Sequence, residues 1–344
     1  MTSTPVFAVI GAGMAGMSCA TELQAAGLGV CVFDKSRGVG GRMSTRREGT
    51  GQWDHGAQYF TASTPEFTQQ IESWLAAGVL AQWQPQLAII PPRPAASPSH
   101  PRRYVGVPAM TAPARHLATR LPLECLRTID AIRRDGQGWQ IHSTERGWHE
   151  ERYAGVALAM PAQQAAALLR PAAPELAALA SAVVMTPCWA AMLQYENALP
   201  LPFDAAFVNQ GPLRWVARNA SKPGREANHC WVLHASPEWS AVHEEDSPDE
   251  VLRALLRAFA ELGAPPPIVG RVHRWRYANL PAIETAPAPG MLWQADLGLG
   301  MCGDWLHGGK VEGAWLSGRA LGRAIAASPR ARHAAAAASA SSGL

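Results

Sequence analysis

The chain has 344 residues, of which 48% are hydrophobic and 17% are charged, and its formal net charge is +3. This length allows two domains, and the composition is ordinary for a soluble globular protein. The net charge is too small and too scattered to indicate nucleic-acid binding, and beyond residue 21 no uncharged apolar run is long enough for a membrane span.

A strand, a glycine turn and a helix are expected in succession at the start of the chain. The apolar run 6–10 leads into a turn with Gly11, Gly13 and Gly16, and a helix-compatible segment extends to Gly27. In a dinucleotide-binding turn the first glycine permits the bend and the second lets the backbone approach a pyrophosphate. The third allows close packing of helix and strand, and the helix N-terminus offers N–H groups to the phosphates.

The first 21 residues carry no charged side chain, so a signal peptide or membrane anchor is the alternative interpretation. No basic segment precedes the apolar run, Glu22 interrupts it, and helix-breaking glycines lie in its middle. We therefore expect neither a signal peptide nor an anchor.

A second apolar strand, 30–33, ends in Asp34. A carboxylate about 20 residues past the glycine turn is suited to bonding ribose hydroxyls. An isolated glycine fingerprint is a weak signal, but strand, spacing and acidic end together favour nucleotide binding over an incidental turn.

The next segment, 35–42, ends in Gly40, Gly41 and Arg42. In flavoproteins with two dinucleotide-binding motifs, a Gly-Gly-Arg element after the second strand closes over the pyrophosphate. Arg42 would supply the fork of donors that phosphate geometry favours. A basic surface loop is the alternative.

Residues 125–161 predict a hairpin that feeds a returning strand. A strand from Cys125 to Arg134, a turn at 135–138 and a strand from Trp139 are followed by a further turn and the strand 156–159. Flavin domains of the Rossmann type insert such a meander between their parallel strands.

A third glycine-rich motif lies near the C-terminus. Met301, Cys302, Gly303 and Asp304 are followed by the segment 308–318 and a helix-like run to about residue 327. This motif resembles the closing motif of the flavin amine-oxidase superfamily, in which the acidic residue bonds the ribityl chain. A helix N-terminus there would stabilise negative charge on the reduced flavin. A glycine-bounded surface helix is the alternative.

Segments spread from residue 6 to about residue 327 resemble renalase, in particular its bacterial form. The matching segments are GVGGRMSTRR at 38–47, WDHGAQYFT at 53–61, RRYVGVPAM at 102–110, LRWVARNASKPGR at 213–225, WVLHAS at 231–236, HRWRYA at 273–278 and GDWLHGGKVEGAWLSG at 303–318. The resemblance implies an α/β fold, in which a Rossmann-type FAD-binding domain like that of p-hydroxybenzoate hydroxylase carries an interleaved α+β substrate domain. It also implies oxidation of the 2-dihydro and 6-dihydro isomers of NAD(P)H to NAD(P)+, with electrons passing to O2 as hydrogen peroxide.

Proline-rich stretches at 91–101, 198–202 and 264–267 predict loops. The tail after Pro329 is low in complexity, and we expect it to be disordered. The expected FAD-binding domain comprises 1–63, 100–165 and 285–327, the substrate domain 64–99 and 166–284, and the tail 328–344.

The resemblance assigns FAD contacts to the three glycine-rich motifs, to the segment 53–60 and to one residue of the meander. The expected FAD-binding residues are Gly11, Gly13, Met14, Ala15, Gly16, Asp34, Lys35, Gly40, Gly41, Arg42, His55, Gly56, Ala57, Gln58, Ile129, Gly303, Asp304, Val311, Glu312, Gly313 and Ala314.

Oxidation of a dihydronicotinamide depends mainly on positioning, because hydride departure yields an aromatic cation directly. Within 53–60, Gly56 would allow close approach to the flavin, and Gln58 and Tyr59 would face its ring. Residence of Tyr59 and Phe60 in the core is the alternative.

Six tryptophans lie between residues 188 and 294, and aromatic planes there could sandwich a nicotinamide ring. Trp215 and Trp275 are favoured because polar residues flank them. Most of the six are expected to be core anchors, and the neighbouring arginines could equally be structural ion-pair partners. The expected catalytic residues are Gln58, Tyr59, Trp215, Arg218, Asn219, His273 and Trp275.

Many amine oxidases place a lysine near the flavin, and some bind flavin through a cysteine in the C-terminal motif. No lysine here stands in a matching context, and Cys302 occupies a strand position. Non-covalent FAD is therefore expected, and amine oxidation becomes less favoured. A flavin amine oxidase, a desaturase on the same scaffold and a non-catalytic nucleotide-binding protein remain alternatives.

The six cysteines form no C-x-x-C pair, which favours free buried thiols in a reducing cytoplasm. The histidines at 142 and 149, or 229 and 234, read as strand residues, and no spacing indicates a metal site. The expected partners are a dihydronicotinamide dinucleotide and O2, without nucleic acid or membrane, and the sequence does not indicate an oligomeric state.

Overall fold

The computed structural model of the protein describes residues 6–91, 101–281, 289–329 and 331. The chain forms two compact units with mixed α/β structure. Unit 1 comprises the described residues within 1–41, 113–184 and 282–344, and unit 2 comprises those within 42–112 and 185–281.

A six-stranded sheet forms the centre of unit 1. Its inner strands are parallel, and only β18 pairs antiparallel, with β19. Four consecutive residues of β1 are buried, as expected for a central strand covered on both faces. The strand order is β18 (Leu292–Gln294), β19 (Leu299–Met301), β12 (Gly155–Leu158), β1 (Val6–Ile10), β2 (Gly29–Asp34) and β8 (Leu123–Cys125).

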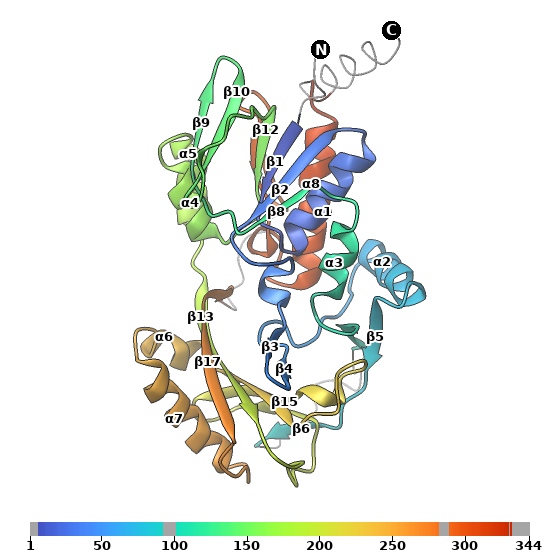
Figure 1. Cartoon of the computed structure of the whole chain (residues 1–344), viewed down its shortest axis with the longest axis vertical. Coiled ribbons are helices and arrows are strands. Elements are labelled where there is room, and N and C mark those ends of the chain that lie inside the picture. Colours follow the sequence, from blue (N-terminus) through green and yellow to red (C-terminus); the bar gives the residue numbers. More distant parts are fainter. Residues whose placement is uncertain (1–5, 92–100, 282–288, 330, 332–344) are drawn as a thin grey trace. The chain divides into compact units, whose positions relative to one another are not determined.

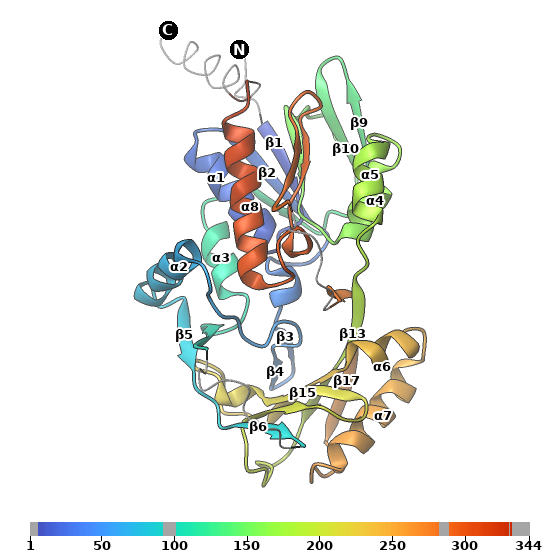
Figure 2. The ribbon, with the colours of Figure 1, turned by 180° about the vertical axis from the view of Figure 1, so that it is seen from behind.

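Two helices, α1 (Met14–Ala25) and α8 (Val311–Ala326), lie side by side along this sheet (Figures 1 and 2). Their contact is close because a Cβ at Gly318 would overlap the carbonyl oxygen of Ala15. Buried side chains of both helices join one hydrophobic core with β1 and β2. The predicted first strand, first helix and C-terminal helix are thereby confirmed.

The predicted meander is present as a three-stranded sheet, but its start was predicted wrongly. Cys125 ends β8 of the parallel sheet, and Leu126 then adopts a positive φ of 55°. This turn separates β8 from the small sheet, which is why the hairpin begins four residues later. Its strands are β9 (Ile129–Asp135), β10 (Gly138–Ser143) and β11 (Gly147–Trp148), and the remaining helices are α3 (Ala112–Ala118), α4 (Ala162–Leu169) and α5 (Pro174–Ser181).

Unit 2 contains a second six-stranded sheet, in which all neighbours are antiparallel except β14 and β6. Its strand order is β17 (Val269–Asn279), β13 (Thr186–Gln194), β16 (Cys230–Ala235), β15 (Leu213–Arg218), β14 (Ala205–Val208) and β6 (Leu87–Ile90).

Helix α7 (Pro248–Ala260) follows β13 and β17 in Figure 1. A capping box between Ser247 and Glu250 begins the helix, and its apolar face buries Leu255 and Phe259 in the core of the sheet. The other elements are α2 (Pro65–Ala76), α6 (Pro237–Val242), the ribbon of β3 (Arg46–Glu48) and β4 (Gly51–Trp53), and the ribbon of β5 (Leu80–Trp83) and β7 (Arg103–Gly106).

The boundaries of the units differ from those expected for the two domains. Residues 42–63 and 101–112 belong to unit 2, and residues 166–184 belong to unit 1. The cause for the first segment is packing: the Trp53 indole is buried and donates to the carbonyl of Leu193 in β13 at 2.9 Å.

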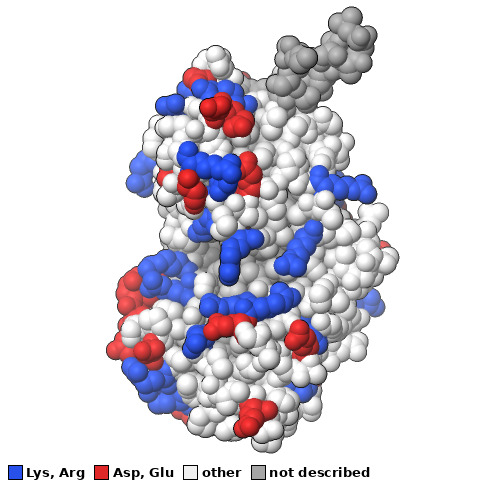
Figure 3. Space-filling model, viewed as in Figure 1, with Lys and Arg blue, Asp and Glu red and all other residues white. Residues whose placement is uncertain are grey.

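The prolines at 198–202 and 264–267 lie outside helices and strands, as predicted. Most of the stretch 91–101 and of the predicted disordered tail lies outside the described residues. Among the described helices, none combines the length and apolar composition needed to cross a membrane. On the face drawn in Figure 3, basic and acidic side chains are interspersed, in keeping with the small net charge.

Candidate functional site

The glycine turn of unit 1 contains glycines of two kinds. Gly11 has a φ of +111° and donates its N–H to the carbonyl of Phe33 at 2.7 Å. A Cβ at Gly16 would overlap the carbonyl oxygen of Gly11. The protein's own backbone therefore requires glycine at both positions.

Gly13 is different, because a Cβ there would meet no heavy atom within 4 Å and its φ of −75° suits any residue. Gly13 is the N-cap of α1, and no side chain caps the helix. The structure thus leaves open space where the N–H groups of the first turn point outward. This arrangement fits a phosphate group, and Met14 and Ala15 provide the first N–H groups of the helix.

Asp34 is held beside the turn by two backbone bonds. Its carboxylate accepts from the N–H of Ala12 at 2.6 Å and from that of Ser36 at 2.7 Å. A carboxylate has about four acceptor positions, so capacity for ribose hydroxyls is left. Lys35, directly after it, is exposed.

The following loop packs against the turn. Gly40 donates to the carbonyl of Ala12 at 2.9 Å, and the Cβ position of Gly41 lies 3.4 Å from the Cα of Gly13. Strand β9 begins at Ile129, two residues after Arg127, and the Arg127 N–H donates to the Asp34 carbonyl at 2.9 Å. Unit 1 therefore brings these predicted residues to one edge of the sheet.

The C-terminal motif reaches the same edge, because β1, β2, β12 and β19 are parallel and end there. Gly303 donates to the hydroxyl of Ser317 at 3.0 Å, and Asp304 is buried at the start of a short 3-10 helix. A Cβ at Gly313 would overlap the carbonyl of His307. The first turn of α8 contains the predicted residues Val311, Glu312, Gly313 and Ala314, of which Glu312 and Gly313 are buried.

These features fit a dinucleotide with a flavin. No packing contact or backbone angle of the protein requires glycine at position 13. The N-termini of α1 and α8 have no side-chain cap and lie at the edge that carries Asp34 and Asp304. The thiol of Cys302 is buried in the core beside β1 and α1, which agrees with non-covalent binding.

Five residues predicted to contact FAD lie in unit 2. The Arg42 carbonyl accepts from the Ala57 N–H at 2.8 Å, and the Arg42 guanidinium donates to the carbonyl of Ala278 at 3.2 Å. A Cβ at Gly56 would overlap the Arg42 carbonyl oxygen. The roles of Arg42, His55, Gly56, Ala57 and Gln58 toward FAD stay predictions.

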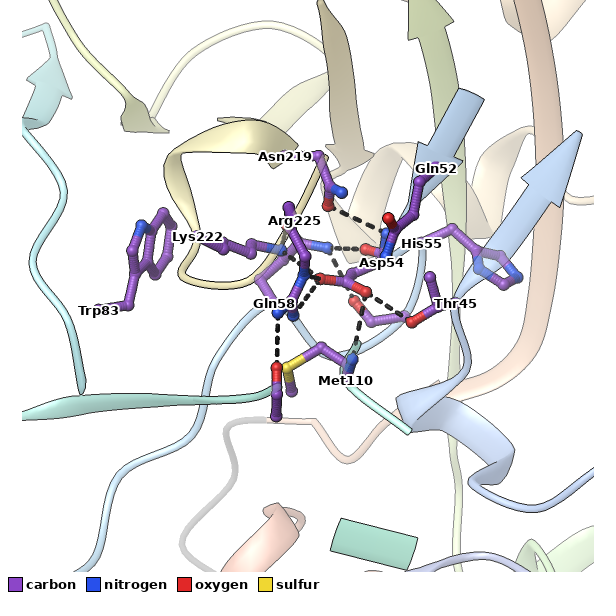
Figure 4. A network of polar contacts seen from close by, with 12 residues as sticks. Thr45, Gln52, Asp54, His55, Gln58, Trp83, Met110, Asn219, Lys222 and Arg225 are labelled. Carbon is purple, nitrogen blue, oxygen red and sulfur yellow. Dashed lines mark hydrogen bonds and ion pairs between the residues drawn. The ribbon is translucent and has the colours of Figure 1, made fainter. Parts of the chain in front are cut away.

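Asp54 is the centre of a buried polar cluster in unit 2 (Figure 4). One carboxylate oxygen accepts from Arg225 Nη2 at 2.7 Å and Nε at 3.0 Å, and from Lys222 Nζ at 3.3 Å. The other accepts from Thr45 Oγ1 at 2.6 Å and from Met110 N–H at 3.3 Å. The side chains of Asp54, Lys222 and Arg225 have no exposed surface.

The electrostatics of the cluster favour charge on Asp54 and oppose it on Lys222. Burial acts to raise the pKa of Asp54, but Lys222, Arg225 and hydrogen bonds outweigh it and lower that pKa to about 2. Burial lowers the pKa of Lys222 to about 8, although Asp54 acts in the opposite direction. At neutral pH the cluster therefore holds two cations and one anion.

Gln58 is fully bonded within the protein. Its Oε1 accepts from Lys222 Nζ at 3.1 Å and from Trp215 Nε1 at 3.4 Å. Its Nε2 donates to the carbonyl of Asp54 and to that of Gly56, the latter at 3.1 Å. The amide has two donors and two acceptor positions, so all four are engaged.

His55 is packed with His273 and Trp275. The centroid of the His55 ring lies 5.0 Å from the ring centroid of His273 and 5.0 Å from that of Trp275. Trp275 Nε1 donates to the His55 carbonyl at 3.0 Å. The same carbonyl is 3.1 Å from His234 Nε2. Burial, aided by the neighbouring histidines, lowers the pKa of His55 to about 3, and burial lowers that of His234 to about 4. These two imidazoles are neutral at physiological pH.

An aromatic group lies beside Gln58. The ring of half-buried Tyr59 has its centroid 5.6 Å from that of Trp215 and 6.1 Å from that of Trp83. The Arg103 guanidinium lies 5.2 Å from the Tyr59 ring centroid, and the Lys222 ammonium 5.6 Å from that of Trp83. Tyr59 is the least enclosed of the three rings.

Two other predicted residues have structural partners. Arg218 forms an ion pair with Asp204, and its N–H also donates to the Asp204 carbonyl at 2.8 Å. Asn219 is fully buried and accepts from Asp54 N–H at 3.1 Å, whereas its Nδ2 is buried with no hydrogen-bond partner in the described chain.

The predicted site residues did not include Asp54, Lys222, Arg225, Trp83 and Arg103, although all but Trp83 lie in the segments quoted from the sequence. A usable signal was present: Lys222 is one of only three lysines and stands in the same motif as Trp215 and Asn219. No lysine stands in a matching context in the sequence, but in the folded protein Lys222 is bonded directly to Gln58.

Two family models match the chain. The model described as an NAD(P)-binding Rossmann-like domain matches residues 9–74. The model described as flavin containing amine oxidoreductase matches residues 104–326, which is more than half of the chain.

Solved structures share the fold at low sequence identity. A candidate protoporphyrinogen oxidase from Exiguobacterium sp. 255-15 is 14% identical, with a TM-score of 0.73 over 95% of this chain and 99% of that one. Wild-type putrescine oxidase bound to putrescine is 14% identical, with a TM-score of 0.70 over 93% and 98%. Cyclohexylamine oxidase from Brevibacterium oxydans IH-35A is 16% identical, with a TM-score of 0.69 over 94% and 99%.

Proposed function

The chain belongs to the flavin containing amine oxidoreductase family, and on that premise we propose that it oxidises the 2-dihydro and 6-dihydro isomers of NAD(P)H. It is a flavin-dependent oxidoreductase with non-covalent FAD. The finer assignment, a renalase-like activity, rests on the sequence segments quoted above and on the charge of unit 2. Bound FAD would supply the hydride acceptor of this reaction, and O2 would take up the electrons as hydrogen peroxide.

The observation that carries the proposal is the excess of positive charge in the buried cluster. Asp54 is the single carboxylate among its members and is paired with both Lys222 and Arg225. A positive cluster disfavours an ammonium substrate, whereas it favours a dinucleotide that carries two phosphate charges. Arg103, close to the Tyr59 ring, adds a further positive charge.

The titratable groups of the region also suit hydride transfer better than proton abstraction. His55 and His234 have strongly lowered pKa values, and Asp54 is enclosed by its partners. Weak bases of this kind are poor proton acceptors at neutral pH. A dihydronicotinamide needs none, because loss of hydride alone gives the aromatic product.

In this mechanism the residues of unit 2 orient the substrate. Tyr59 supplies an aromatic surface and packs against Trp215 and Trp83, and Arg103, close to its ring, would attract phosphate. Trp275 and His273 form a second aromatic group around His55. Unit 1 holds FAD through the glycine turn, Asp34 and the motif at 303–314.

A flavin amine oxidase is the second candidate, and two observations favour it. The family model itself is that of amine oxidoreductases, and Lys222 is a buried lysine with a lowered pKa. A protein that only binds nucleotides is the third candidate.

We also propose a reducing, cytoplasmic environment for the protein, and its six free cysteines support this proposal.

The test is anaerobic stopped-flow bleaching of the flavin, followed by peroxide detection when O2 is admitted. We expect rapid bleaching by 2-dihydro and 6-dihydro NAD(P)H and slow bleaching by the 4-dihydro form and by amines. Rapid bleaching by an amine alone would establish the second candidate. Retention of FAD without bleaching by any reductant would indicate the third.

A further inference from the structure

The buried cluster of unit 2 contains one cation more than its carboxylate requires. Arg225 contacts one oxygen of Asp54 through two nitrogens, and Thr45 and Met110 bond the other oxygen. Asp54 and Arg225 by themselves form a neutral pair that is hydrogen-bonded on both oxygens. Lys222 is therefore not needed to neutralise Asp54.

Keeping Lys222 in this position costs stability. Its side chain has no exposed surface, and its charge faces Arg225 as well as Asp54. A buried charge without its own counter-ion is unfavourable, and an apolar residue of similar volume is often at least as stable there. A residue that is costly for folding points to a role in something other than folding.

The contact that stability does not explain is the one with Gln58. Lys222 Nζ donates to Gln58 Oε1 at 3.1 Å, and the only other donor to that oxygen in the described chain is Trp215 Nε1, at 3.4 Å. Two carbonyls of the turn 54–56 occupy the other end of the amide. A charged donor fixes which end of an amide is the oxygen far more strongly than an indole at 3.4 Å.

We propose that Lys222 is a positioning residue, which acts through Gln58. Its ammonium holds the Gln58 amide in one orientation, and the amide in turn fixes the turn 54–58 and the indole of Trp215. Tyr59 follows this turn directly and its ring packs against that indole. The inference deepens the proposed function and rests on it, because Tyr59 and Trp215 are the side chains assigned there to the substrate.

The central variant is Lys222→Met, which removes the charge, keeps the length of the side chain and leaves Asp54 paired with Arg225. We expect it to fold with at least the thermal stability of the wild type and to retain FAD. We expect kcat to fall roughly tenfold to a hundredfold, the effect of losing one charged hydrogen bond, with a smaller change in KM. The matched control is Arg214→Met, which removes an exposed cation next to Trp215 in β15. It should leave kcat and KM unchanged.

The route through Gln58 is tested by a double-mutant cycle with Gln58→Leu. If Lys222 acts through Gln58, Lys222→Met should have almost no further effect on kcat in the Gln58→Leu background. Additive effects would overturn the route. A Lys222→Met protein that is clearly less stable than the wild type, with unchanged kcat per folded molecule, would overturn the positioning role.

The pH dependence gives a readout that does not need turnover. The groups that act on Lys222 are the Arg225 guanidinium, Asp54, which is ionised near pH 8, and His234, which is neutral there. Because the Lys222 pKa is lowered on folding, Lys222 makes the free energy of unfolding rise with pH between about 8 and 10.5. Buried thiols with raised pKa values, such as Cys188 and Cys230, make it fall in the same range, but equally in the wild type and in Lys222→Met. The free energy of unfolding of the wild type minus that of Lys222→Met should therefore rise between about pH 8 and 10.5, and a difference that stays constant would contradict the buried surplus charge.

The kinetic cycle uses whichever reductant bleaches the wild-type flavin. Bleaching by an amine and not by the dihydronicotinamide isomers would reject the proposed substrate, while the cycle would still test Lys222. A failed cycle with active isomers would reject the Lys222 inference and leave the proposed function in place.

Discussion

The two kinds of glycine in the turn make different predictions for Gly→Ala substitutions. Gly13→Ala is the informative change, because the methyl group would enter space that the protein leaves open. The φ of −75° needs no adjustment, and exchange of glycine for alanine at an N-cap costs roughly 0.5 to 1 kcal/mol. The FAD-free protein should therefore remain folded.

The effect on FAD should be larger. A methyl group inserted into a well-packed contact typically costs about 1 to 3 kcal/mol. This corresponds to a roughly fivefold to 150-fold increase in the Kd for FAD. The difference between a small change in folding and a large change in affinity identifies a glycine that serves the ligand.

The assay is fluorescence titration of FAD into the FAD-free variants, together with their thermal unfolding. Gly16→Ala is the first control and should destabilise the protein itself, since its methyl group would overlap the Gly11 carbonyl. Gly136→Ala, in the turn after β9 with open space around it, is the second control and should change neither quantity. A folded Gly13→Ala protein with the wild-type Kd for FAD would refute the reasoning.

Three further predictions concern single side chains. Arg42→Ala should weaken FAD binding roughly tenfold to a hundredfold if its guanidinium holds the pyrophosphate, measured as the FAD Kd; unchanged affinity would remove Arg42 from the site. Asp54→Asn should cost about 3 to 5 kcal/mol at pH 7, because it leaves two buried cations unpaired. The Asp54 pKa is lowered from 3.8 to about 2, so the stability that ionised Asp54 contributes should be present above pH 4 and lost toward pH 2. If the stability of Asp54→Asn fell with the same slope as that of the wild type in this range, the prediction would be contradicted. Tyr59→Leu removes the aromatic surface and should lower kcat/KM for the substrate, whereas Tyr59→Phe keeps the ring and should not; a lower melting temperature of Tyr59→Leu with unchanged kinetics would identify the ring as structural.

Much of the nucleotide-binding unit could be read from the sequence, because its determinants are local. The strand 6–10, the glycine turn and the helix are contiguous, and Asp34 lies at the end of the next parallel strand. Parallel strands bring their carboxyl ends to one edge, so a motif far along the chain, around Asp304, meets the turn once the topology is known. Periodicity and the glycine pattern are sufficient for this much.

The polar cluster of unit 2 depended on the tertiary structure. Lys222 and Arg225 lie 168 and 171 residues from Asp54 in the sequence, and their proximity follows from the packing of the turn 54–58 against the segment after β15. The same packing engages every hydrogen-bonding position of Gln58, and its predicted place against the flavin ring stays a prediction. Whether a polar side chain faces a ligand or is used up by its neighbours depends on which distant groups are buried beside it, and no local pattern carries that information.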